Sequence, residues 1–186
     1  KGVSGRLVRN LRWMRHRWIM RVLAPISGYW HLSPLQIIHN PENTTGPIQR
    51  RAMVNMIANF ARNELLQYSD WILADAFRSI DQRRDYRAEL ERLTVPTLFV
   101  AGARDILATA DAVKDTMERL GATDKKFVIC SRAQGYAVNY GHFDLTIGNR
   151  APDEIFPLIS GWISAHEGVA VVEAPEVSSE APAPVS

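Results

Sequence analysis

The sequence predicts an α/β fold, and two apolar runs joined by an amphipathic stretch carry this prediction. Residues 97–101 and 127–130 are largely apolar without alternation, which is typical of parallel strands covered on both faces. Residues 109–120, which lie between them, have the spacing of an amphipathic helix. Because a strand, a helix and a strand at this spacing form a βαβ unit, we expect the two strands to be parallel.

The composition is that of an ordinary globular protein. Of the 186 residues, 46% are hydrophobic and 23% are charged, and the formal net charge of +2 is too small to predict nucleic-acid binding. The single cysteine, Cys130, excludes an internal disulfide and a cysteine-based zinc site. No run reaches the roughly 20 apolar residues that cross a bilayer. We therefore expect a soluble, cytoplasmic protein, and the start at Lys1 without methionine indicates a fragment or a processed product.

Residues 3–24 predict an amphipathic helix with a strongly basic side. Its apolar positions, three or four residues apart, are Val3, Leu7, Leu11, Met14, Trp18 and Val22. Its basic positions are Arg6, Arg9, Arg12, Arg15, Arg17 and Arg21. We interpret it as a helix whose apolar stripe packs on the core, and the alternative is a helix that contacts an anionic membrane surface or an acidic partner.

The following segment predicts helices separated by an irregular connection. Residues 25–47 are rich in proline and glycine and read as a connection, and helices are expected over 48–60, 65–77 and 81–93. Methionine and aromatic residues at helical spacing are expected in the core, with the alternative that some line an acyl-sized pocket. A last helix over 153–166 should pack on the sheet, and residues 168–186 have the composition of a disordered tail.

An acid and a histidine follow the two predicted strands. Asp105 comes shortly after the first strand and His142 follows the second strand through a longer loop. Because the carboxyl ends of parallel strands meet at one edge of a sheet, both side chains should lie there. A functional site shared by the two residues is one interpretation. The alternatives are that Asp105 is a turn or helix-capping residue and that His142 is a hydrogen-bonded loop residue. Asp144 is expected to cap the short turn that follows it, and Cys130 to be a buried strand residue.

The stretch VPTLFVAGARDILA followed by YGHFDL resembles the end of an α/β-hydrolase, and is most similar to lipases and esterases and also to polyhydroxyalkanoate synthases. The resemblance covers residues 94–167. It implies the last parallel strands of the α/β-hydrolase sheet with their flanking helices, preceded by a helical cap or lid region over residues 1–93. The chain order of acid before histidine agrees with that family, in which the nucleophile comes first.

The same resemblance implies the C-terminal portion of a serine hydrolase that cleaves apolar carboxylic esters without a cofactor. His142 would be the general base and Asp105 would orient it. The nucleophile would lie upstream, because the nearest sequence to Gly-x-Ser-x-Gly, at Gly2–Gly5, has Arg6 where the second glycine is required. Alternatives are an acyltransferase of the polyhydroxyalkanoate synthase type with a cysteine nucleophile, or a non-catalytic interaction module using residues 3–24.

Overall fold

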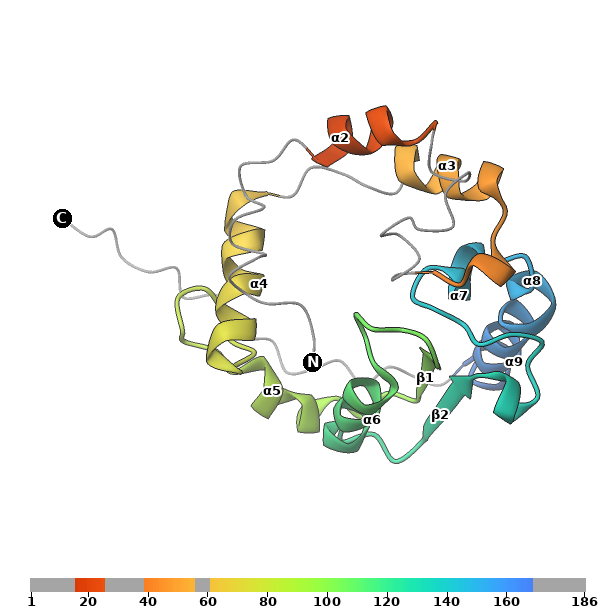
Figure 1. The fold of residues 1–186 in the computed structure, drawn as a ribbon. Helices are drawn as coiled ribbons and strands as arrows, with labels where there is room; N and C mark the ends of the chain where they lie inside the picture. Colours follow the sequence, from red (N-terminus) through yellow and green to blue (C-terminus); the bar gives the residue numbers. More distant parts are fainter. Residues whose placement is uncertain (1–15, 26–38, 56–60, 169–186) are drawn as a thin grey trace.

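The computed structural model describes residues 16–25, 39–55 and 61–168 (Figure 1). Its helical elements before the sheet are α2 (His16–Leu23), η3 (Pro41–Asn43), α3 (Gly46–Asn55), α4 (Arg62–Ala74), α5 (Tyr86–Glu89) and η4 (Leu90–Arg92). In the view of Figure 1, α2 and α3 lie at the top, α4 lies at the left, and α5 lies at the lower left next to α6 (Ala110–Arg119). The first part of the helix predicted over 3–24 and the tail predicted after Gly168 lie outside the described residues.

The sheet consists of two parallel strands, β1 (Thr97–Gly102) and β2 (Lys125–Cys130). Their register pairs Thr97 with Lys125 at one end and Gly102 with Cys130 at the other. The crossover helix α6 (Ala110–Arg119) begins where the Thr109 hydroxyl accepts a hydrogen bond from the Ala112 backbone N–H. The predicted βαβ unit and the α/β class are therefore confirmed.

The elements after the sheet build the core around the end of β2. They are η5 (Arg132–Gln134), α7 (Asp144–Ile147), α8 (Ala151–Glu154) and α9 (Phe156–Ala165). The buried apolar cluster comprises Cys130, Val138, Tyr140, Ala151 and Ile155, with Val100, Val128, Tyr136 and Leu145 packed against it. This cluster fixes the loop after β2 against both the sheet and the last helices.

Two helix predictions were wrong in their extent. Over residues 81–93 the chain first makes a turn, with Gln82 at φ 61°, and the helix begins only after Asp85, whose carboxylate accepts hydrogen bonds from the N–H groups of Arg87 and Ala88. The predicted last helix is two helices, α8 and α9. The second begins with Phe156 and Pro157, and a proline at that place has no N–H to continue the preceding helix.

Several apolar side chains predicted to pack on the core are exposed. On α2, Trp18 is 65% and Val22 54% exposed, so the prediction that this stripe is buried was wrong for both. Ile159 and Ile163 on α9 are also exposed, whereas Ile155 is buried. Among the described residues, no helix is both long and apolar enough to span a membrane.

Candidate functional site

The ends of β1 and β2 are held together by backbone hydrogen bonds at the edge where the candidate site lies. The Tyr140 N–H donates to the Cys130 carbonyl over 3.1 Å, and the Arg104 N–H donates to the Tyr140 carbonyl over 2.8 Å. Gly102 permits this close approach, because a Cβ atom there would stand only 2.5 Å from the Tyr140 oxygen. The residues that follow β1 are thereby placed against the loop that returns from β2.

Asp105 and His142 are brought together at this edge. Nδ1 of His142 lies 2.8 Å from Oδ2 of Asp105, although the two residues are 37 positions apart. The Asp105 side chain is only 2% exposed, whereas that of His142 is 36% exposed. The juxtaposition predicted from the chain order is present, and a catalytic role for the pair stays a prediction.

The second carboxylate oxygen of Asp105 is held by the backbone. Oδ1 accepts hydrogen bonds of 2.9 Å from the N–H groups of Leu107 and Ala108. Asp105 is therefore a turn residue, as one reading of the sequence predicted, and it is also the hydrogen-bond partner of His142. The turn leaves Oδ2 directed at the imidazole, which favours the neutral tautomer with the proton on Nδ1.

The other ring nitrogen of His142 has no hydrogen bond to any residue that the structure describes, and the ring is more than one-third exposed. In the Nδ1–H tautomer, Nε2 carries a lone pair and can accept a proton. Apolar side chains flank the pair: Ile106 and Leu107 are exposed, and the Phe143 ring centre lies 5.4 Å from that of His142. The arrangement can do general-base chemistry beside an apolar surface.

Asp144 has a different place from the predicted one. It does not cap the helix that follows, because both of its carboxylate oxygens accept from the Gly141 N–H, at 3.0 and 2.9 Å. The Asn40 N–H, 3.1 Å from Oδ1, also donates to this buried carboxylate. Asp105, and not Asp144, is therefore the acid that contacts His142.

Asn40 and its neighbour Asn43 were not singled out for the site by sequence reasoning. The stretch Asn43–Thr45 reads as turn chemistry, and Asn43 does belong to the short helix η3, but its side chain is fully buried. The available signal was weak: Asn40 directly before Pro41 predicts a turn, and this says nothing about which distant loop that turn contacts.

Cys130 is buried, as predicted, and burial raises the pKa of its thiol to about 11. A thiol with this pKa is almost fully protonated at neutral pH, so Cys130 is unsuited to be a nucleophile.

The loop after β2 is fixed by Glu154, whose carboxylate accepts from the Tyr140 hydroxyl over 2.7 Å and from the Ala137 N–H over 2.9 Å. These groups support the His142 loop from the side of α8.

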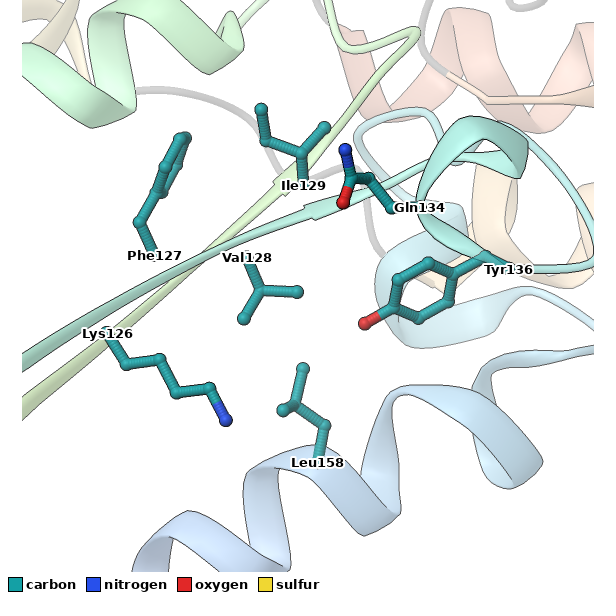
Figure 2. Close-up of a pocket in the computed structure, with 7 residues that line it drawn as sticks. All are labelled: Lys126, Phe127, Val128, Ile129, Gln134, Tyr136 and Leu158. Carbon is teal, nitrogen blue, oxygen red and sulfur yellow. The ribbon is translucent and has the colours of Figure 1, made fainter.

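A pocket of about 320 Å³ lies along β2, away from Asp105 and His142. Figure 2 shows Val128 facing Leu158 of α9, with Phe127 and Ile129 on the other side of the strand. The remaining lining residues are Lys126, Gln134 and Tyr136. Neither Asp105 nor His142 lines this pocket, so it is separate from the candidate site.

No metal site accompanies this geometry in the part of the chain that the structure describes, where no three histidine, cysteine, aspartate or glutamate side chains gather as metal ligands would. Comparison with protein-family models and with curated proteins found no match to this chain. The α/β architecture and the geometry of Asp105 and His142 are therefore the grounds on which a function can be proposed.

Proposed function

We propose that this chain is the C-terminal portion of a serine hydrolase that cleaves carboxylic esters, of the lipase and esterase kind. The single observation that carries the proposal is the 2.8 Å contact between Nδ1 of His142 and Oδ2 of Asp105, at the carboxyl ends of two adjacent parallel strands. Ligands of open α/β sheets bind at this edge. Residues 1–93 would form the cap, and residues 94–167 the end of the catalytic domain.

In the proposed reaction, His142 Nε2 takes the proton of a serine hydroxyl as that oxygen attacks the ester carbonyl. The same nitrogen then returns the proton to the leaving alkoxide, and water hydrolyses the acyl-enzyme by the same route. Asp105 keeps the ring in the Nδ1–H tautomer and stabilises the imidazolium. The exposed side chains of Ile106 and Leu107 favour a substrate with an apolar acyl group.

The one cysteine of the sequence, Cys130, forms no disulfide, and this agrees with a protein that works in the cytoplasm.

Covalent labelling of the protein encoded by the complete reading frame tests this proposal. A fluorophosphonate should label a serine outside the 186 residues, and the labelling rate should fall strongly in His142→Ala because the base is gone. His166→Ala is the matched control and should label normally. Absence of a labelled serine in the folded wild-type protein would contradict the hydrolase proposal.

The acyltransferase alternative predicts a different labelled residue. In an enzyme of the polyhydroxyalkanoate synthase type, iodoacetamide should modify a cysteine outside these residues, and acyl groups should pass from a thioester to a hydroxyl acceptor. Cys130 cannot be that cysteine, since it is buried and its pKa is raised. The identity of the labelled residue therefore separates the two enzymes.

A second candidate function is peripheral contact of residues 3–24 with an anionic membrane. The observation that favours it is the exposure of Trp18 and Val22, one helical turn apart on α2. Co-sedimentation with vesicles containing phosphatidylserine should be lost when Arg9, Arg12 and Arg15 are neutralised. Wild-type protein that does not sediment at low salt would contradict this candidate.

A further inference from the structure

Three polar residues from the cap side of the sequence, Asn40, Asn43 and Thr44, are buried, and Asn40 contacts both loops of the candidate site. Asn40 is 1% exposed and Asn43 is fully buried, although asparagine usually lies at the surface. Buried amides are retained where hydrogen bonds satisfy them. The question is therefore what the Asn40 amide holds.

The Asn40 side chain touches both loops at once. Its Nδ2 donates to the Asn139 carbonyl over 2.8 Å, three residues before His142. Its Oδ1 accepts from the Arg104 guanidinium over 3.1 Å, at the residue directly before Asp105. One planar amide thus connects the loop that carries the acid with the loop that carries the histidine.

The orientation of this amide is set locally. Asn40 precedes Pro41 and caps η3, and its Oδ1 also accepts from the Glu42 N–H over 3.1 Å. Donors therefore converge on the oxygen and a carbonyl faces the nitrogen, which determines which end of the amide points to each loop. Aspartate could not replace it, because a carboxylate has no donor for the Asn139 carbonyl.

The backbone of Asn40 adds a third connection. Its N–H donates to Asp144, and the same carboxylate holds the Gly141 N–H directly before His142. Gly141 is required here, because a Cβ atom would stand 2.8 Å from Asp144 Oδ1 and 3.1 Å from the His39 Cα. The backbone of His39 and Asn40 is thereby packed against the histidine loop.

We propose that Asn40 is a positioning residue that keeps the Asp105 and His142 loops at the separation at which His142 holds one tautomer. A role of Asn40 in catalysis rests on the proposed function, whereas its effect on the tautomer of His142 does not. Asn40 acts through the two loops, and its amide makes its contacts to Asn139, Arg104 and Glu42. Removing the amide frees the loops to shift, and a misplaced imidazole loses its fixed partner.

Two-bond ¹H–¹⁵N NMR spectra of the imidazole report the tautomer from carbon-bound protons and need no enzymatic activity. Spectra of the wild type and the variants are recorded at the same alkaline pH, so that the two neutral tautomers are compared. Wild-type His142 should show the Nδ1–H form, and Asn40→Ala should move it towards a mixture with the Nε2–H form. Asn40→Asp should move it in the same direction by a smaller amount, because the carboxylate loses the donor to the Asn139 carbonyl but still accepts from Arg104 and from the Glu42 N–H.

Two further variants keep the test decisive. Arg104→Met removes the hydrogen bond from the guanidinium to Asn40 Oδ1. Because Arg104 is exposed, this variant should fold even if Asn40→Ala does not, and it should shift the tautomer of His142 in the same direction by a smaller amount. Asp85→Ala, which removes a helix cap far from the site, controls for general loss of stability and should leave the His142 signals unchanged.

A wild-type tautomer retained in Asn40→Ala and in Arg104→Met, with both folded, would overturn the proposal, as would a mixture of tautomers in the wild type. Failure of the hydrolase proposal is distinguishable. In that case no serine is labelled in the complete protein, while the dependence of the His142 tautomer on Asn40 is still observed.

Discussion

Two aspartate–histidine pairs in the C-terminal half have nearly equal hydrogen-bond lengths and different chemistry. The strand-end pair, Asp105 and His142, has an N···O distance of 2.8 Å, and the terminal-helix pair, Asp124 and His166, one of 2.9 Å. In the terminal-helix pair the other ring nitrogen, Nδ1, lies 2.7 Å from the Trp162 carbonyl. Both ring nitrogens of His166 therefore face acceptors, whereas within the described part of the chain His142 has a hydrogen bond at Nδ1 alone.

The difference decides which ring can act as a base. A ring that donates from both nitrogens is an imidazolium and has no lone pair for a further proton. In agreement, the Trp162 carbonyl and then Asp124 raise the pKa of His166. Distance alone is thus a poor guide, because the free nitrogen and the buried, backbone-held carboxylate distinguish His142 from His166.

The largest difference between the pairs is expected in catalysis by the complete protein. His142→Ala should lower kcat for ester hydrolysis by about 10⁴-fold or more, since the proton acceptor is lost. His166→Ala should leave kcat within about threefold of the wild type, after correction for the folded fraction. Equal losses in both variants would remove the distinction drawn between the two rings.

Substitution of Asp105 should likewise lower kcat far more than substitution of Asp124. Asp105→Asn preserves the shape but presents an amide to the imidazole, and a fall in kcat of about 10³- to 10⁴-fold is expected from loss of the tautomer. Asp124→Asn should have little effect on kcat. Steady-state kinetics with an apolar ester provides the measurement, and a fully active Asp105→Asn enzyme would rule out the orienting role.

Asp105 and Asp124 should also differ in how much each contributes to the free energy of unfolding. Asp105→Ala leaves two backbone N–H groups and the imidazole without their buried partner, and should lower the free energy of unfolding by about 2 kcal/mol. Asp124 is 57% exposed, so Asp124→Ala should cost less than about 1 kcal/mol. Urea unfolding of the two variants against the wild type measures both, and a larger cost for Asp124→Ala would reverse the comparison.

The smallest effect is a pH dependence of stability at the terminal-helix pair. Because the pKa of His166 is raised in the folded state, its contribution to stability is fully present below the unfolded pKa of about 6.5 and is lost as the pH rises through the folded value. The stability advantage of the wild type over His166→Gln should therefore shrink from acidic to alkaline pH. An advantage that grows with pH would contradict the raised pKa of His166.

Local patterns predicted the parts of the fold that depend on neighbours in sequence. The continuous apolar runs and the spacing between them identified β1, α6 and β2, and the parallel-sheet rule then placed Asp105 and His142 at one edge. The same patterns could not predict the exposure of Trp18 or Ile163, since an apolar stripe identifies a face and not whether anything covers it.

By itself, the sequence determined an α/β chain with an acid and a histidine after successive strands. Only the tertiary structure showed that Asp124 meets His166, and that Asn40 connects the loops of Asp105 and His142. The physical reason is distance along the chain: Asn40 bonds to residues 99 and 104 positions away, and Asp124 meets His166 across 42. No helical or strand periodicity extends so far, so these contacts exist only once the core has folded.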